Sequence, residues 1–207
     1  MDRTTRPPRR SPKAEERRLD AERSRRLLLD AALEEFAAKG YAGARVQDIA
    51  DRAGVNKQLI SYYFGGKEGL YREIGRQWLA REAELNAPET PLGELWLRYF
   101  RDAQADPRGG RLNVWRGLTE DLAEIPDEQR EDLSDLRRRQ AAGELADDLE
   151  PEAVMLLTMA MVTMPAVMPH MIRTVYGLAP DSPEFQHRYA TRLRRIAHHL
   201  AGGRTTC

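Results

Sequence analysis

Three observations predict an all-α fold for this chain of 207 residues. Apolar side chains recur every three or four residues through most of the sequence. None of these segments alternates in the way that is typical of a half-buried strand. Glycine, proline, serine and asparagine stand where such segments begin or end. We therefore expect an N-terminal three-helix domain followed by a larger helical domain.

The first 22 residues are predicted to form a flexible basic arm. Residues 1–20 contain three prolines and almost no large apolar side chain, which is typical of an unfolded segment. The chain is neutral, yet residues 1–26 hold ten basic and five acidic side chains. A basic end on a neutral protein indicates a polyanionic partner for that end. A tail that only increases solubility is the alternative.

The first helix is predicted from about Arg23 to Lys39. Leu28, Ala32 and Phe36 recur every four residues along it, so they lie on one face that can be buried. Gly40 follows as the C-terminal cap, because glycine readily takes the left-handed conformation that ends a helix.

Two short helices follow and form a candidate helix-turn-helix. Their inner faces consist of Val46, Ile49, Ala50 and Ala53 in the second helix and Leu59, Ile60 and Tyr63 in the third. Gly54 can take the left-handed conformation of the turn, and Val55 can fill the space beneath it. Asn56 is suited to cap the third helix. The alternative is a surface helical hairpin whose polar side meets only water.

The outer face of the third helix carries hydrogen-bonding side chains. They are Asn56, Lys57, Gln58, Ser61 and Tyr62. Asparagine and glutamine amides can pair with adenine edges, and lysine can reach guanine. Serine and tyrosine hydroxyls can donate to phosphate oxygens. Lys67 would begin the next helix, where the helix N-terminus also attracts a phosphate. These residue types predict contact with DNA.

The segment RRLLLDAALEEFAAKGYAGARVQDIADRAGVNKQLISYYFGGKEGLYREI resembles the DNA-binding domain of the TetR family of bacterial transcriptional repressors. It runs from residue 25 to residue 74. Three motifs carry the resemblance: A-x-x-x-F-x-x-x-G-Y from Ala32, I-A-x-x-A-G-V from Ile49, and Y-F-x-x-K-E-x-L from Tyr63. Residues 75–207 are similar to the family only in helix content and length.

The resemblance implies an all-helical homodimer whose third helix enters the major groove of a palindromic double-stranded DNA operator. It also implies that a ligand in the C-terminal domain releases the DNA. The matching DNA-contact positions are Arg45, Val46, Asn56, Lys57, Gln58, Ser61, Tyr62, Tyr63 and Lys67. Three of them depart from the family pattern: Ser61 replaces a frequent tyrosine, Tyr63 a frequent histidine, and Arg45 a frequent threonine. Tyr62 can take over the phosphate contact.

We assign residues 23–70 to the DNA-binding domain and residues 71–207 to a helical ligand-binding and dimerisation domain. The later helices are predicted at 67–85, from 92 to the run DPRGG, and at 111–124, 127–149, 151–176 and 183–202, with Ser182 as the last N-cap. Pro165 and Pro169 should kink the apolar helix at 151–176. That helix and the last one can form a two-fold four-helix interface between two copies.

Aromatic and methionine side chains predict a ligand pocket in the C-terminal domain. Trp96, Tyr99, Phe100 and Trp115 would form one wall, and Met155, Met159, Met164 and Met168 the other. Flexible thioethers tolerate varied ligands. Because almost no charge lies among these residues, we expect a mostly apolar or aromatic ligand. The same residues would look alike as ordinary core and dimer packing.

Other functions find little support in the sequence. The four histidines form no metal-binding motif, and no nucleophile elbow or phosphate loop is present, so we expect neither a cofactor nor an enzyme. The only cysteine is Cys207, which leaves no disulfide framework within one chain. No apolar run is long enough to span a membrane, and the start lacks the apolar region of a secretion signal. We expect a cytoplasmic protein.

The leading hypothesis is a dimeric repressor that a small molecule releases from its operator, with the helix at 67–85 as the lever between the two domains. One alternative is a ligand-independent DNA-binding or architectural protein whose C-terminal domain only dimerises. Another is an enzyme. Loss of DNA affinity on ligand binding would separate the first hypothesis from the second, and turnover of a ligand would support the third.

Overall fold

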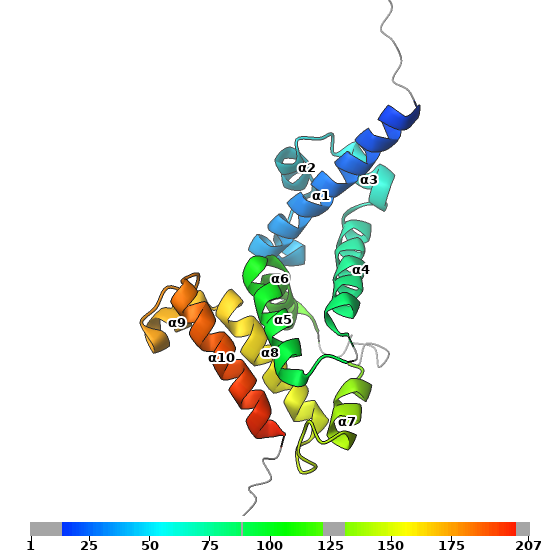
Figure 1. Ribbon diagram of the computed structural model, residues 1–207. Coiled ribbons are helices and arrows are strands. Elements are labelled where there is room, and N and C mark those ends of the chain that lie inside the picture. Colours follow the sequence, from blue (N-terminus) through cyan, green and yellow to red (C-terminus); the bar gives the residue numbers. More distant parts are fainter. Residues whose placement is uncertain (1–13, 88, 122–130, 202–207) are drawn as a thin grey trace, which may run out of the picture.

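The computed structural model describes residues 14–87, 89–121 and 131–201, and all regular structure in these segments is helical (Figure 1). The helices are α1 (Ala14–Gly43), α2 (Val46–Ala53), α3 (Gln58–Phe64), α4 (Lys67–Leu85), α5 (Leu92–Ala105), α6 (Arg108–Thr119), α7 (Ser134–Ala141), α8 (Pro151–Val167), α9 (Pro169–Tyr176) and α10 (Pro183–Leu200). In Figure 1, α1–α3 form the upper domain, α5–α10 form the lower one, and α4 runs between them. The predicted all-α class is confirmed.

The first helix starts earlier than predicted, so the predicted arm at 1–22 is too long by residues 14–22. The first turns of α1 consist mainly of alanine, glutamate and arginine, which favour helix. Arg18 also lies within ion-pair distance of Glu15 (Nη2–Oε1, 3.7 Å) and of Glu22 (Nη1–Oε1, 3.3 Å) on the adjacent turns. Residues 1–13 of the predicted arm lie outside the described residues.

The N-terminal domain packs around α1. Its core includes Leu28, Ala32, Phe36, Ile49, Ala50 and Ile60, all fully buried. Leu70 from the first turn of α4 and Leu112 from α6 are part of the same core. The three predicted helices therefore do not close this core alone, because α4 and α6 complete it.

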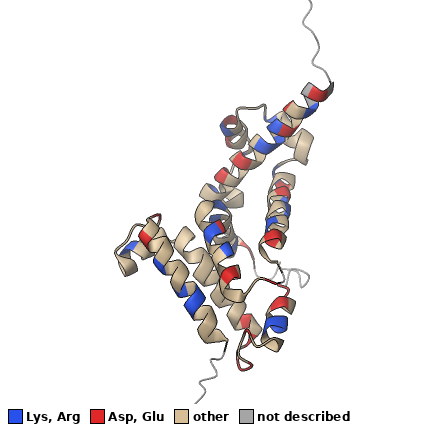
Figure 2. Cartoon of the chain, in the orientation of Figure 1, with Lys and Arg blue, Asp and Glu red and all other residues tan. Residues whose placement is uncertain are grey.

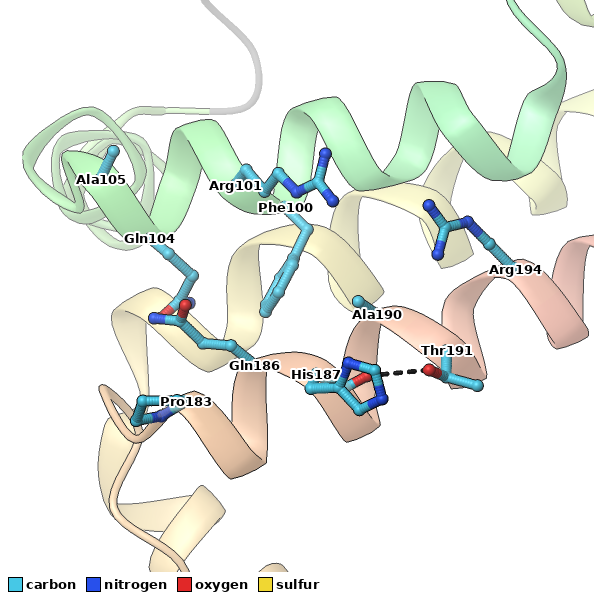
Figure 3. A pocket seen from close by; sticks show the side chains of 10 residues that line it. All are labelled: Phe100, Arg101, Gln104, Ala105, Pro183, Gln186, His187, Ala190, Thr191 and Arg194. Atoms are coloured by element: carbon cyan, nitrogen blue, oxygen red, sulfur yellow. Dashed lines mark hydrogen bonds between the residues drawn. The ribbon is translucent and has the colours of Figure 1, made fainter.

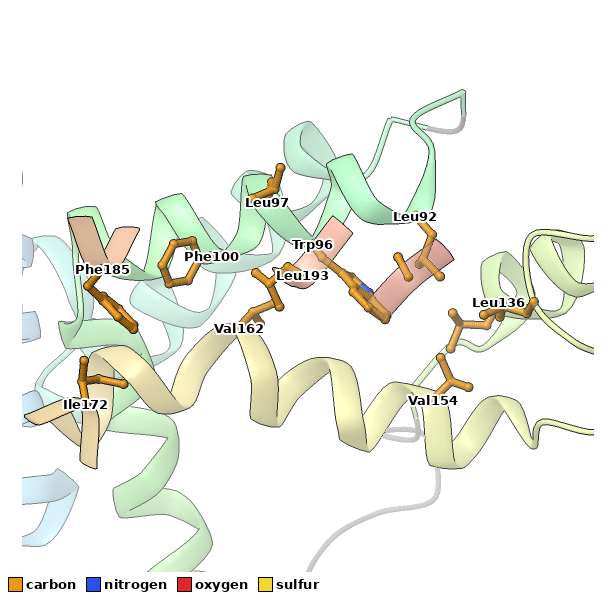
Figure 4. Close-up of a cluster of buried hydrophobic side chains, with 12 residues drawn as sticks. Leu92, Trp96, Leu97, Phe100, Leu136, Val154, Val162, Ile172, Phe185 and Leu193 are labelled. Atoms are coloured by element: carbon orange, nitrogen blue, oxygen red, sulfur yellow. The ribbon is translucent and has the colours of Figure 1, made fainter. Parts of the chain in front are cut away.

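The core of the C-terminal domain lies where α5 packs against α8 and α10 (Figure 4). Trp96 and Phe100 of α5 are at most 2% exposed. The Phe100 ring lies 5.1 Å from the ring of Tyr189 in α10, centroid to centroid. The Tyr189 hydroxyl donates to the Met161 carbonyl of α8 at 2.7 Å, so its polar end is satisfied inside the core.

The predicted helix at 111–124 is shifted. α6 spans Arg108–Thr119, because the Asp106 carboxylate accepts the backbone N–H of Arg108 at 3.1 Å and caps an earlier start. Residues 122–130 lie outside the described residues.

The predicted long helix at 127–149 is correct only for α7: residues 131–133 are not helical, and the chain leaves the helix after Ala141 and turns at Gly143 (φ 77°). The fully buried Arg139 holds this turn in place. Its guanidinium donates to the carboxylates of Asp135 (2.6 Å) and Glu144 (2.8 Å) and to the Thr90 carbonyl (2.8 Å). These bonds tie α7 to the segment before α5 and favour the turn over a continued helix.

The predicted apolar helix at 151–176 is broken once. α8 continues through Pro165, whereas Pro169 begins α9 after a bend of 94°. Ser182 caps α10 as predicted, with its Oγ accepting the backbone N–H of Phe185 at 3.2 Å. No single helix among the described residues is long and apolar enough to cross a membrane. α8 and α9 reach that length and composition only together, across their bend.

Candidate nucleic-acid interface and effector region

The turn between α2 and α3 has the geometry that a helix-turn-helix requires. Gly54 adopts φ 66° and ψ 30°, a left-handed conformation that costs glycine little. Its N–H donates to the Asp51 carbonyl at 3.1 Å. The Asn56 side chain then caps α3, because its Oδ1 accepts the backbone N–H of Gln58 at 2.8 Å. The predicted break at Gly54 and the predicted cap at Asn56 are both confirmed.

The polar face of α3 points to solvent. Its exposed residues are Asn56, Lys57, Gln58, Ser61 and Tyr62. Tyr62 is the most open of the aromatic residues here, with 78% of its surface exposed. The opposite face holds the fully buried Ile60, which anchors α3 in the core. The structure therefore presents five of the nine predicted DNA-contact residues on one rigid, accessible surface, which we call the α3 face.

Of the other predicted contact residues, Arg45 is exposed, whereas Val46 and Tyr63 are half-buried. Arg45 is exposed at the N-terminus of α2, whereas Val46 is half-buried and packs on the domain core. Tyr63 is also half-buried, with its ring 5.0 Å from that of Tyr62 and 6.3 Å from that of Phe64. Val46 and Tyr63 thus support the surface that the α3 face presents.

Lys67 points back toward its own domain. Its ammonium lies 4.5 Å from the ring centroid of Tyr41, and its Nζ is 3.5 Å from the Ala42 carbonyl oxygen. This burial lowers the pKa of Lys67 below the ordinary lysine value. A phosphate contact through Lys67 requires its side chain to swing out of this position.

Sequence reasoning missed Arg25 as a support of the α3 face. Its guanidinium lies 4.9 Å from the ring centroid of Phe64 and 5.8 Å from that of Tyr63. Its Nη1 also donates to the Tyr63 carbonyl at 3.3 Å. Arg25 and Tyr63 are 38 positions apart in the sequence, so no local pattern could have indicated the contact.

The predicted aromatic wall of a ligand pocket is not assembled. Trp96 and Phe100 are buried in the core of the C-terminal domain. Trp115 lies against α1 instead, where its Nε1–H donates to the Ala37 carbonyl at 3.2 Å. The prediction failed for Trp115 because helical spacing shows that a residue is buried but does not identify the helix that covers it.

The four methionines of the predicted second wall are half-buried or exposed, and Tyr99 contacts a different helix. Met159 and Met168 are exposed, while Met155 is half-buried against the core; Met164 is half-buried as well. Tyr99 lies beside Glu82 of α4, and burial raises its pKa to about 12, with the Glu82 carboxylate as the next cause. Burial also raises the pKa of Glu82. Tyr99 therefore belongs to a polar contact between α4 and α5.

The C-terminal domain reaches the DNA-binding domain mainly through α6. Leu112 enters the core of the N-terminal domain, and Trp115 bonds to α1. Arg108 forms an ion pair with Asp30 of α1 at 2.7 Å. α6 also packs on α8, where a Cβ on Gly110 would come within 2.9 Å of Val167. α6 thus bridges α1 and α8.

A groove of about 490 Å³ lies between α5 and α10, away from the predicted methionine wall. The described residues contain no group of three or more histidine, cysteine, aspartate or glutamate side chains that could hold a metal ion.

Two family models match the chain over both domains. Residues 28–74 match "Bacterial regulatory proteins, tetR family", and residues 92–199 match "Tetracyclin repressor-like, C-terminal domain". The first match covers the helix-turn-helix, and the second covers α5 to α10 up to residue 199.

Individual proteins agree with the family models. The HTH-type transcriptional repressor SCO4008 of Streptomyces coelicolor is 31% identical over 166 residues, which are 76% of this chain and 86% of that protein. The HTH-type transcriptional regulator RutR of Escherichia coli K12 is 35% identical over 95 residues, covering 42% and 45% of the two chains. The crystal structure of SCO4942 from Streptomyces coelicolor superposes with a TM-score of 0.67 at 27% identity and covers 84% of this chain and 97% of that one.

Proposed function

The chain belongs to the TetR family of bacterial DNA-binding transcriptional regulators, and from that premise we propose that it represses transcription from a palindromic operator until a small molecule binds its C-terminal domain. The α3 face is the observation that carries the proposal. It combines amide, ammonium and hydroxyl groups on a helix that Ile60 anchors from behind. Amide and ammonium groups of this kind read base edges in the major groove.

Two copies of the chain are needed to read such an operator, because one short helix touches few base pairs. α8 carries exposed Leu156, Leu157 and Met159, and α10 carries exposed Ile196. Large exposed apolar side chains on neighbouring helices support a protein interface. We assign this surface to the two-fold contact between two copies, as a four-helix arrangement of α8 and α10.

Release of the operator would proceed through α6. A ligand that changes the packing of α8 acts on α6 at Gly110, and α6 acts on α1 through Leu112 and Trp115. α4 remains the covalent link between the domains, but α6 makes the larger contact with α1. A coupling of about 1–3 kcal/mol would lower operator affinity five- to 150-fold. We expect the effector to have an apolar or aromatic body.

The basic N-terminal segment would add phosphate contacts beside the α3 face. Residues 2–13 contain five basic and one acidic side chain and directly precede α1. Deleting them should reduce the dependence of DNA binding on salt without changing the preferred sequence. An unchanged salt slope, measured by fluorescence anisotropy, would remove this segment from the DNA interface.

The proposal is tested by selecting duplexes from a random-sequence pool with the full-length chain. We expect a two-fold symmetric motif with half-sites about one helical turn or a multiple apart. Enrichment of a single asymmetric half-site, or of no motif, would contradict the proposal.

One observation favours a ligand-independent regulator as the second candidate. Trp96, which was expected to line a cavity, is part of a close-packed core. A thermal-shift screen of apolar and aromatic compounds, followed by operator titration with every compound that binds, separates the two candidates. Binders that leave operator affinity unchanged support the second.

A further inference from the structure

The groove between α5 and α10 combines an apolar floor with a polar rim (Figure 3). Phe100 and Ala190 contribute the apolar side chains. Arg101 of α5 and His187 and Arg194 of α10 contribute basic ones, and none of the ten lining residues is acidic. A volume of about 490 Å³ is in the range of small-molecule sites.

Two guanidinium groups approach the groove from facing helices. Figure 3 shows those of Arg101 and Arg194 extending into the same space between α5 and α10. The Glu94 carboxylate accepts two hydrogen bonds from Arg194, from Nε at 2.5 Å and from Nη2 at 3.3 Å. The hydrogen bond from Arg194 lowers the pKa of Glu94, and the charges of Arg194 and Arg101 both lower it further. Arg101 forms no ion pair with any residue in the described part of the chain. Glu94 occupies the Nε side of Arg194, so an anion in the groove would meet the Arg101 guanidinium and the remaining N–H groups of Arg194.

A buried amide donor adds to this site. The Nε2 of Gln104, which also lines the groove, is inaccessible to solvent and has no acceptor among the described residues. A buried donor without a partner is costly, so such groups in native proteins normally find an acceptor. Because this Nε2 is covered, a ligand oxygen in the groove would reach it after the Gln104 side chain turns toward the groove.

Basic residues lie on several sides of α10, and Arg194 is the arginine among them that lines the groove. Arg188, Arg192, Arg194 and Arg195 all lie on this helix, and Figure 2 shows basic residues along it. Its first turn holds one acidic residue, Glu184, which does not line the groove.

We propose that the α5–α10 groove binds a carboxylate carried on a small apolar or aromatic body. The carboxylate lies between Arg101 and Arg194, since a guanidinium can donate two parallel hydrogen bonds to it. The apolar body covers Phe100 and Ala190, and Gln104 can donate to a ligand oxygen once its side chain turns toward the groove. As an effector site, the groove rests on the function proposed above and narrows the effector to an anion.

The groove stays accessible when two copies pair through α8 and α10. Ala190 and Arg194 are one turn apart and share the groove side of α10. Arg192 and Ile196 are likewise one turn apart. Because each residue of an α-helix is rotated by about 100° from the one before, these two lie on the side of α10 roughly opposite the groove. The apolar surface around Ile196 can therefore face a partner while the groove faces solvent.

The test is fluorine NMR of 4-(trifluoromethyl)benzoate titrated with the full-length chain, with 4-(trifluoromethyl)benzamide as the neutral probe of equal shape. We expect the benzoate to bind and the benzamide to bind about tenfold more weakly or not at all. Arg101→Ala should weaken benzoate binding about tenfold, and Arg194→Ala should weaken it as well. Arg195→Ala removes the same charge from α10 outside the groove and should leave binding unchanged.

Three results would overturn the proposal: equal binding of benzoate and benzamide, equal loss in the Arg195→Ala control, or no benzoate binding at all. Inorganic phosphate that binds as tightly as benzoate would overturn the role of the apolar floor. Thermal unfolding of each variant identifies a loss of fold. DNA binding of the same preparations is measured without probe, so that failure of the groove proposal is distinguished from failure of the repressor proposal.

Discussion

Glu35 joins the first two helices of the DNA-binding domain through a buried carboxylate. Only 3% of this residue is exposed. It accepts hydrogen bonds from Arg52 of α2, Nε at 3.0 Å and Nη2 at 2.9 Å, and it forms an ion pair with Lys39 of α1 at 2.6 Å. The hydrogen bond from Lys39 is the largest cause that lowers the pKa of Glu35, and the bond from Arg52 lowers it further against the effect of burial.

Replacing Glu35 with Gln should destabilise the folded chain by about 1–3 kcal/mol, because two cations lose a buried carboxylate. The lowered pKa gives the effect a pH dependence. The stabilisation of the folded state by the charged Glu35 is complete at pH values above the ordinary carboxyl pKa of 4.5. It is lost as the pH falls through the lower pKa that Glu35 has in the folded state. Urea unfolding at neutral pH and in steps below 4.5 measures it. A gap between wild type and variant that stays constant with pH would contradict this account.

Gln58 lies on the α3 face with its side chain in solvent. Gln58→Ala should lower operator affinity by about 1–3 kcal/mol and relax the preference at one base pair, because a lost amide pairing affects only the base that it reads. Tyr62→Phe, which removes a hydroxyl suited to phosphate, should weaken binding to all sequences alike. Anisotropy titrations against operator variants check both. Unaltered selectivity in Gln58→Ala would show that this side chain does not read bases.

Single residues were predictable where their chemistry acts on neighbouring backbone. Gly54, Asn56 and Ser182 each fix a turn or a cap within a few residues, and the structure confirms all three. Arg25 and Arg139 act across long separations in sequence. An arginine in a helical segment carries no mark of such a partner, so neither role could be predicted.

At the scale of elements, α6 packs closely on α1 across the boundary between the two domains. The backbone of α1 bends at Gly40 (φ 68°), and the Trp115 ring of α6 lies against this bend. A Cβ at Gly40 would come within 3.1 Å of that ring. The Trp115 ring can therefore occupy this position only because residue 40 has no side chain.

Gly40→Ala should destabilise the chain by about 1–3 kcal/mol, because alanine is strained at positive φ and its methyl group meets the indole. Gly117→Ala is the matched control on α6, since nothing lies within 4 Å of a Cβ there. It should stabilise by up to about 1 kcal/mol through helix propensity. Thermal and urea unfolding measure both. Equal effects of the two substitutions would show that α1 and α6 do not meet at this glycine.

The sequence predicted most helices, but it could not predict which of them contact one another. Periodicity identified the buried face of α5, yet Trp96 on it fills a core, and Phe100 borders a groove toward α10 and not the predicted methionine wall. It also indicated a long helix after residue 126, because nothing local shows that Arg139 binds Glu144 and Thr90 across a turn. The α3 face needed only local information, whereas a pocket requires the packing of several helices.

At the scale of the whole molecule, large exposed apolar side chains lie on several of the described helices, among them α8 and α4. Leu156 and Leu157 lie on α8, on the side away from its buried Val154 and Val162. Leu79 is exposed on α4, which links the domains. The α8 surface is continued by a second long helix, α10 with Ile196, which suits it to a symmetric four-helix contact.

Leu157→Arg should convert the dimer into a monomer at micromolar concentration. Leu157 is 53% exposed in the single chain, so an arginine there fits the monomer but places two like charges near the two-fold axis of the dimer. Leu79→Arg is the control, because this residue is 64% exposed on a helix outside the proposed interface. Sedimentation velocity reports the assembly state, and operator titration reports its consequence. A monomer holds one α3 face and should lose most of its operator affinity, since the two half-sites are no longer bound together. A dimeric Leu157→Arg variant, or a wild-type chain that sediments as a monomer with operator bound, would place the contact elsewhere.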